Sequence, residues 1–292
     1  MVSGNTTTGS LADSLDSVRS AARVVREQKG GMQQLCRRET LGVGIGLSWQ
    51  EVKINQLTAQ RVTEDTVLDN PQQYADSLLT ITPTIIGIHT FVTDRVKNRI
   101  NKMALAKMGE GAQNSIERLK DQDGLTVLAT GATTASPGAG NTLTSGHIAA
   151  AKVNISSNAT EPGNPPYRCV LHGFQIKDLF DELVAGVGTY AIPDGVTATV
   201  FKTGFTLPIA GCEVYENGNI TIDSSTDATG GVFSTEGIIY VQGAAPRVTS
   251  ERKENIGGGG EMIYHYDEYA YGLGNSTTWV QTIVSDATAP SA

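Results

Sequence analysis

An alternation of apolar and polar positions runs through residues 48–92 and is the most informative pattern in the chain. Two strand-like arms flank a polar turn region at 63–73. The second arm alternates from Leu79 to Val92, and the first alternates in two pieces that a one-residue bulge would join. The pattern predicts a long β-hairpin that is only half apolar and has little core of its own. Because unpaired strand edges invite pairing with another chain, we expect the hairpin to reach over a neighbouring copy.

Helical spacing of apolar residues predicts an amphipathic helix over 11–29, ended by Gly30 and Gly31. A separate face of this helix carries Arg19, Arg23 and Arg26. These arginines form either a solvated basic face or a contact with nucleic acid or an acidic neighbour. Charge alone does not choose between the two.

A second amphipathic helix is predicted over about 95–120. Gly109 and Gly111 lower its helix propensity, so a bend or a break is expected there. A short apolar piece follows at 124–130. The segment 131–146 is rich in Gly, Ala, Ser and Thr, and is predicted to be a flexible connection between subdomains.

Strand patterns dominate the rest of the chain. Residues 148–155 and 169–172 fit either short strands or a helix and a strand, and 174–185 fits a short helix. Strands are expected within 196–222, where 216–219 supplies a hairpin turn. Residues 233–242 fit helix or strand, and 247–284 alternates around four glycines at 257–260 and a group of tyrosines. The fold class is α+β, with more strand than helix.

Composition limits the function. The 292 residues carry a net charge of −8, which argues against a protein whose main task is to bind nucleic acid, since that task rests on Lys and Arg. No apolar run of about 18 residues is present and the start lacks a signal-peptide pattern, so we expect synthesis in the cytoplasm and no membrane contact. Cys36, Cys169 and Cys212 are odd in number and widely spaced, which predicts buried reduced thiols.

Candidate catalytic groups do not form a recognisable site. The four histidines lie far apart without a metal-binding spacing, and the glycines of 42–46 lack the Lys-Ser/Thr of a phosphate-binding loop. Cys169 and His172 are expected on opposite faces of a strand. The acidic pairs are interpreted as solvated charges at helix ends. These pairs are Asp121 with Asp123 and Asp181 with Glu182. We therefore predict that the chain is not an enzyme and binds no cofactor and no metal.

The order of these elements, from about 11 to 284, resembles the major capsid protein of tailed bacteriophages, which has the Hong Kong 97 capsid fold. Local stretches are similar as well: DQDGLTVLATGAT, VLHGFQIKDLFDEL, GFTLPIAGCEVYENG and GIIYVQGAAPRVTSERKENIGGGGEMIYHYDEYAYG. The resemblance implies an N-terminal arm at 1–46 and an extended loop at 47–86. It also implies a peripheral domain at 87–143 and 226–292 with a spine helix at about 95–120, and an axial domain at 144–225.

The resemblance further implies a structural protein that self-assembles as hexamers and pentamers into an icosahedral shell around double-stranded DNA. It would be made in the host bacterial cytoplasm and reside in the virion capsid. Expected partners are a separate scaffolding protein, because few residues precede the hairpin, a portal, a cement protein, and DNA in weak non-specific contact. The basic arm of Arg19, Arg23 and Arg26 would face the lumen or a neighbour. The apolar hairpin contacts would be Trp49, Val52, Ile54, Leu79 and Ile81.

Two alternatives remain at this stage. An encapsulin-like nanocompartment shell has the same fold and packages protein cargo. A β-rich carbohydrate-binding or hydrolytic domain would use the tyrosines of 264–271 as an aromatic platform, although tyrosines on a strand more often serve core and interface. Lys53 lies on the hairpin, but no partner for a cross-link is evident, and none is predicted.

Overall fold

The computed structural model describes residues 31–42, 44–65, 71–99, 102–186, 208–275 and 278–290. The predicted α+β class is confirmed, and the predicted helix over 11–29 lies outside the described residues. The elements are α1 (Met32–Leu35), β1 (Arg37–Thr40), β2 (Trp49–Ile54), β3 (Asp76–Ile81), β4 (Thr84–Thr93), α2 (Asp94–Arg99), α3 (Lys102–Leu128), α4 (Ser145–Ser156), β5 (Tyr167–Leu171), α5 (Gly173–Gly186), β6 (Cys212–Glu216), β7 (Asp227–Ser234), β8 (Ile238–Gln242), β9 (Arg247–Lys253), β10 (Gly260–Leu273) and β11 (Val280–Asp286).

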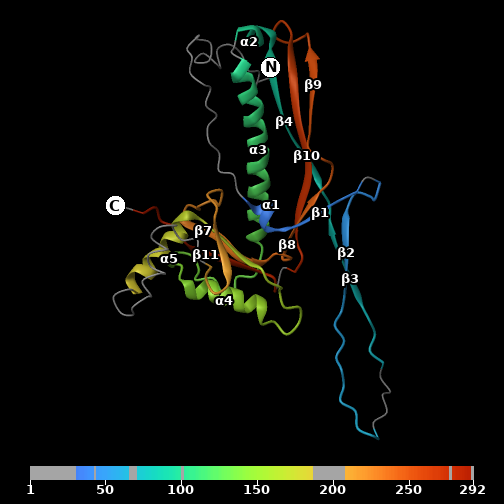
Figure 1. Ribbon diagram of the computed structural model, residues 1–292, viewed down its shortest axis with the longest axis vertical. Coiled ribbons are helices and arrows are strands. Elements are labelled where there is room, and N and C mark those ends of the chain that lie inside the picture. Colours follow the sequence, from blue (N-terminus) through green and yellow to red (C-terminus); the bar gives the residue numbers. More distant parts are fainter. Residues whose placement is uncertain are drawn as a thin grey trace.

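The largest sheet among the described residues has the order β1-β8-β10-β4, with β9 also paired to β10. Its central strand, β10, pairs with β4 on one side, and with β9 and then β8 on the other. The long helix α3 lies along this sheet (Figure 1). The alternation at 247–284 is thus confirmed as strands, and Gly257, Gly258 and Gly259 make the turn before β10 with positive φ angles.

A second sheet has the order β11-β7-β5-β6, and α4 packs against β7 and β11. Of the two predictions for 148–155 and 169–172, the second is confirmed, because the structure has a helix, α4, followed by a strand, β5. The turn at 216–219 was predicted to close a hairpin, and this is wrong, because β5 lies between β6 and β7 in the sheet. The run 233–242 is neither a single helix nor a single strand, since it holds the end of β7 and all of β8.

The connection at 131–146 was predicted to be flexible, but the structure ties the part before α4 to β11. Ala132 N–H donates to the Val280 carbonyl at 3.1 Å, and Thr282 N–H donates to the Ala132 carbonyl at 2.7 Å. Further along, Gly138 N–H donates to Val284 O, and Leu143 is fully buried. The small residues allow the segment to lie close against the strand, so their role is packing rather than freedom.

The spine helix reaches further toward the C-terminus than the predicted range of about 95–120, and the first residues of that range belong to α2. The short apolar piece at 124–130 is mostly the last turns of α3, which continues to Leu128, and Gly109 and Gly111 lie within the helix without breaking it. Leu125 and Leu128 are buried in the core that α3 shares with α1 and the sheet strands. This burial outweighs the low helix propensity of the two glycines, as tertiary packing often does.

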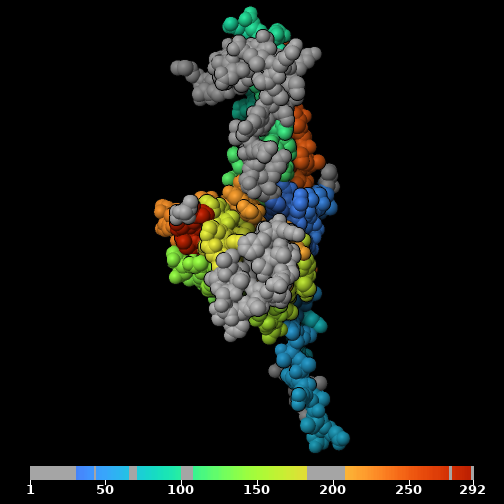
Figure 2. Space-filling model, turned by 60° about the vertical axis from the view of Figure 1, so that its left-hand side comes forward, coloured from blue at the N-terminus to red at the C-terminus, as the bar shows by residue number. Residues whose placement is uncertain are grey.

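The molecule is elongated. In Figure 1, α3, β4, β9 and β10 extend from the body in one direction, and the β2–β3 loop extends in the opposite direction. Figure 2 shows that loop as a thin projection that stands clear of the other atoms. Among the described residues, one large hydrophobic cluster of the body lies around α1 and the end of α3, and another lies between α4 and the second sheet. The three cysteines are buried and free, as predicted.

Candidate assembly interface

The paired strands β2 and β3 form the base of the projecting loop. They pair antiparallel, from Trp49 opposite Ile81 to Ile54 opposite Asp76. Residues opposite one another share a face, and side chains alternate between faces along each strand. The inner face carries Trp49, Glu51, Lys53, Ser77, Leu79 and Ile81, and the outer face carries Gln50, Val52, Ile54, Asp76, Leu78 and Thr80.

The apolar residues of the inner face seat the loop on the body. Ile81 is 5% exposed and forms a cluster with Ile239 and Val241 of β8. Trp49 and Leu79 pack against the same cluster. Burying a side chain of this size contributes about 1.5–3 kcal/mol, so the seat is a genuine structural attachment.

An ion pair reinforces this seat. Arg37 of β1 places Nη1 3.1 Å from each carboxylate oxygen of Glu51, and its guanidinium lies 5.6 Å from the centre of the Trp49 ring. Partial burial opposes the positive charge, but hydrogen bonds to Glu51 and Glu39 outweigh it, so the pKa of Arg37 lies above its usual value. The loop base is therefore held by apolar and charged contacts together.

The apolar residues of the outer face are exposed, in contrast to those of the inner face. Val52, Ile54 and Leu78 are 59%, 63% and 56% exposed. Val52 lies directly opposite Leu78, and Ile54 is the next residue on that face of β2. Single exposed apolar residues are common, but an apolar strip on a projecting element is typical of an interaction surface.

Beyond the six paired positions the loop has no described ladder. Asn55 N–H donates to the Ala75 carbonyl at 2.9 Å, Ala75 N–H donates to Asn55 Oδ1 at 2.7 Å, and Thr58 N–H donates to Gln72 Oε1 at 2.8 Å. The predicted long hairpin is thus confirmed only at its base. The slip in alternation after Ile54 marks the end of the ladder, and the predicted bulge is wrong.

The second predicted arm divides between two sheets. β3 ends at Ile81, Thr82 and Pro83 follow, and β4 pairs with β10 in the body instead of with β2. Proline ends the pairing because it has no N–H to donate. The alternation of 84–92 is real, but it belongs to the body sheet.

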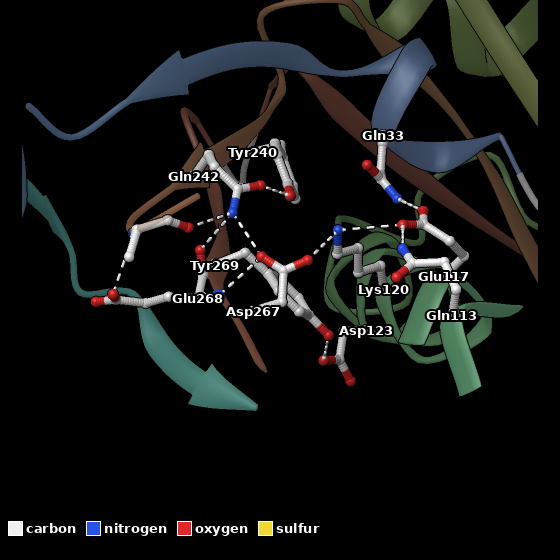
Figure 3. A network of polar contacts seen from close by, with 11 residues as sticks. Gln33, Gln113, Glu117, Lys120, Asp123, Tyr240, Gln242, Asp267, Glu268 and Tyr269 are labelled. Atoms are coloured by element: carbon white, nitrogen blue, oxygen red, sulfur yellow. Dashed lines mark hydrogen bonds and ion pairs between the residues drawn. The ribbon is translucent and has the colours of Figure 1, made fainter. Parts of the chain in front are cut away.

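A buried polar junction joins α3 to the sheet that carries the loop (Figure 3). Lys120 Nζ lies 2.5 Å from Asp267 Oδ2, and the two side chains are 4% and 1% exposed. Gln242, the last residue of β8, donates from Nε2 to Asp267 Oδ1 at 2.7 Å. Burial opposes the charge of Lys120, but the bond to Asp267 outweighs it and the pKa of Lys120 is raised. We call Lys120, Asp267 and Gln242 the spine junction; it links α3, β10 and β8.

A neighbouring carboxylate corrects a prediction. Asp121 was expected to be a solvated charge at a helix end, but it is 1% exposed and lies within α3. It accepts hydrogen bonds from Met32 N–H at 3.1 Å, Asn217 Nδ2 at 2.7 Å and Asn219 Nδ2 at 2.9 Å. Three donors replace its water, which is what a buried carboxylate requires. Asp123 is partly buried and accepts from the Tyr269 hydroxyl at 2.7 Å.

The second acidic pair follows the prediction more closely. Asp181 and Glu182 are both exposed on α5. Asp181 pairs with Lys177, and Glu182 accepts hydrogen bonds from the backbone and hydroxyl of Ser145 at the start of α4. These contacts join α5 to α4 at the surface.

The groups considered for catalysis serve packing. Burial raises the pKa of the Cys169 thiol well above its ordinary value, so this thiol is not prepared for thiolate chemistry. Burial also lowers the pKa of His172. Residues 42–46 lead into β2 and not into a helix, as predicted. Among the described residues, no cluster of three or more His, Cys, Asp or Glu is placed to hold a metal ion, and no helix is long and apolar enough to span a membrane.

The tyrosines of β10 do not form one platform. Tyr264 and Tyr266 stack on one side, with ring centres 5.9 Å apart. Tyr269, 3% exposed, and Tyr271 lie on the other side and belong to the core around α3. A sugar-binding surface built from all four is incompatible with this division.

Comparison with known proteins gives a result only at the level of structure. No family model and no curated protein is similar to the sequence. Solved structures are similar over nearly the whole chain: a structure from Mycobacterium phage Che8 (TM-score 0.72, 13% identity, 94% of this chain and 98% of that one) and the capsid of Ralstonia phage GP4 (0.68, 12%, 95% and 96%). The Cyanophage Pam1 capsid asymmetric unit has a TM-score of 0.72 and 13% identity, and covers 99% of this chain and 100% of that one. The chain has the Hong Kong 97-type capsid fold.

The five hairpin residues that were predicted to contact a neighbouring subunit lie on two different faces of the β2–β3 pair. Trp49, Leu79 and Ile81 lie on the inner face and pack within the chain, whereas Val52 and Ile54 lie on the outer face. The prediction of inter-subunit contact remains open for all five, but only the outer pair is free to make it without leaving its own core.

Sequence reasoning missed Leu78, which completes the outer strip of the capsid fold's extended loop. Its signal was the strand register, since counting back from Ile81 opposite Trp49 places Leu78 opposite Val52. Arg19, Arg23 and Arg26 lie outside the described residues, so their predicted role remains a prediction.

Proposed function

We propose that this chain is a major capsid protein, which assembles with copies of itself into the icosahedral shell of a tailed phage. The fold supports this proposal, because the solved structures that are similar to this chain include the capsids of Ralstonia phage GP4 and Cyanophage Pam1. The observation that carries the proposal is the projecting loop, with Val52, Ile54 and Leu78 exposed along its outer face. A neighbouring copy is the partner that would bury this strip in a closed shell.

Assembly would rest on many moderate contacts. In a closed shell of hexamers and pentamers each subunit binds several neighbours, so leaving the shell means breaking all of its contacts together. Residues 144–225 would meet their copies around the symmetry axes as the axial domain. The bounds expected from the sequence assign 87–143 and 226–292 to a peripheral domain around the spine helix α3, and 47–86 to the loop that reaches the neighbour. In this proposal β7 and β11 belong with the axial domain instead, because they share a sheet with β5 and β6, and the loop ends before β4, which pairs with β10.

Charge supports a modest contact with the genome. The net charge of −8 would keep the shell from gripping double-stranded DNA, whose binding depends on released counterions and on Lys or Arg. A scaffolding protein, a portal and a cement protein remain proposed partners. The work of the chain in this proposal is assembly in the virion, with no chemical step.

Electron microscopy and sedimentation of the full-length chain test the proposal. We expect closed shells from the unaltered chain and folded, unassembled subunits after deletion of 62–74 from the loop. Val248→Asp, a change at an exposed position of β9 to which no interface is assigned, is the control that should still assemble. A chain that stays monomeric under all assembly conditions, or closed shells from the deletion, would contradict the proposal. DNA rather than protein cargo in shells from infected cells separates a phage capsid from an encapsulin-like compartment.

A further inference from the structure

Two segments that are distant in the sequence converge on Glu161 beside the loop. Lys53, near the end of β2, places Nζ 2.5 Å from Glu161 Oε2. Asn275, between β10 and β11, donates from Nδ2 to the same oxygen at 2.7 Å. Trp279 Nε1 donates to the backbone carbonyl of Glu161 at 2.9 Å. Glu161 lies between α4 and β5, so this one residue connects the loop to two parts of the body.

The backbone of Glu161 is strained. Its φ angle is +53°, in the left-handed region that glycine and asparagine adopt far more readily than glutamate. Such outliers persist where surrounding contacts hold them, and they gather at functional positions. Here both the carboxylate and the carbonyl of Glu161 are used, which accounts for a glutamate at a position where glycine would be easier.

Lys53 acts at a distance from the hydrophobic seat of the loop. Trp49 and Lys53 lie on the same face of β2, and four residues of strand span about 13 Å. The seat at Trp49 and Ile81 fixes one point of the projecting loop, and Lys53 provides a second point farther out. Two separated attachments fix the direction of a rod, whereas one attachment leaves it free to pivot.

We propose that the Lys53–Glu161 ion pair is a latch that sets the angle at which the extended loop leaves the body. Asn275 and Trp279 hold Glu161 in place to receive Lys53. The pair is half exposed, with side chains 48% and 29% accessible, so salt screens it and the latch opens reversibly. For its consequence in assembly the inference rests on the proposed function, because an unlatched loop would reach its neighbour at variable angles and give shells of mixed size.

A distance measurement on full-length, unassembled subunits tests the latch without reference to shells. Spin labels on Arg61→Cys in the loop and Asn154→Cys on α4 report the loop angle, because both positions are exposed and the three native thiols are buried. We expect a narrow distance distribution in the parent protein. Glu161→Gln and Lys53→Met should each shift and broaden it, and high salt should do the same to the parent.

Two further variants separate the latch from general charge effects. Lys177→Glu breaks an ion pair on α5 that has the same 2.5 Å separation, and it should leave the distribution unchanged. The double reversal Lys53→Glu with Glu161→Lys should narrow the distribution relative to Lys53→Glu alone, although a lysine at 161 cannot accept the hydrogen bond from Asn275. Circular dichroism of each variant confirms that the body is folded.

The outcomes distinguish this inference from the proposed function. A parent-like distribution in either Glu161→Gln or Lys53→Met overturns the latch, even if shells form normally. Shifted distributions together with a parent chain that never forms shells would uphold the latch and overturn the capsid function. Shells of mixed size from both variants would support the two together.

Discussion

Two ion pairs of equal length hold different parts of this molecule in different ways. Lys120 and Asp267 at the spine junction are 4% and 1% exposed, whereas Lys53 and Glu161 at the loop are 48% and 29% exposed, and each pair spans 2.5 Å. A buried pair fails at a high energetic penalty when one partner is lost, while an exposed pair contributes little to stability. The comparison teaches that the distance between two charged groups does not by itself show what an ion pair does. The solvent exposure of the pair determines whether it stabilises the core or only orients a loop.

The largest expected effect comes from breaking the buried pair. Lys120→Met leaves Asp267 charged and buried, which should lower the free energy of unfolding of the subunit by about 3–5 kcal/mol. Urea denaturation of unassembled subunits measures it. The matched change at the exposed pair, Lys53→Met, should lower it by less than about 1 kcal/mol. Equal losses from the two variants would show that burial is not the deciding difference.

The next effect compares the two faces of the loop. Ile81→Ala removes a buried side chain from the cluster with Ile239 and Val241, and should lower the free energy of unfolding by about 2–4 kcal/mol. Val52→Ala removes a similar apolar group from the exposed face and should change it by less than about 0.5 kcal/mol. Thermal and urea unfolding of both variants give the contrast, and a large loss from Val52→Ala would mean that the outer face is covered within the subunit.

Alkali tests the buried thiol of the body. Burial raises the pKa of Cys36 from 9.0 to about 12, so above pH 9 the unfolded chain loses a proton that the folded chain keeps. Stability is therefore complete below pH 9 and falls as pH rises toward 12, by about 1.4 kcal/mol at about pH 10 for this thiol. Burial also raises the pKa of Tyr271, which acts in the same direction.

Urea unfolding at a series of pH values measures this loss. In Cys36→Ala the decline between pH 9 and 12 should be shallower, although the small cavity lowers stability at every pH. A slope that is the same with and without the thiol would contradict the assignment to Cys36.

The last change should have a small effect on stability and the largest effect on assembly. Val52→Asp with Leu78→Asp should change the free energy of unfolding by less than about 1 kcal/mol, because both side chains already face water. In sedimentation, however, the doubly changed chain should remain unassembled, since two carboxylates cannot be buried against a neighbour without partners. Unaltered shells would remove the outer strip from the interface, and Val248→Asp again serves as the control.

Local patterns predicted local elements well. Alternation located β2, β3, β9 and β10, helical spacing located α3 and α5, and the spacing of the cysteines indicated buried free thiols. These features depend on residues close in sequence, whose periodicity is the same before and after folding. The errors have a common cause. Each error could be avoided only by knowing a partner that lies far away in the chain. The errors are the assignment of 84–92 to the hairpin, of 216–219 to a hairpin turn and of Asp121 to a solvated position.

The outer strip shows the same limit within the candidate site. Five apolar residues stood out on the hairpin, but their division between an inner and an outer face follows from a register that two strands set together, and Leu78 was missed for that reason. Glu161 carried no signal at all, because its φ angle and its contacts with Lys53, Asn275 and Trp279 exist only in the folded chain.

By itself, the sequence determined which segments become strands or helices and that the thiols are buried, because side-chain periodicity and backbone preference act over a few residues. Only the tertiary structure decided which strands pair, which carboxylates are buried and which face of the loop stays exposed. Those outcomes depend on contacts between segments far apart in the sequence, such as Lys53 with Glu161 and Lys120 with Asp267. The partners of such contacts become neighbours only when the whole chain has folded.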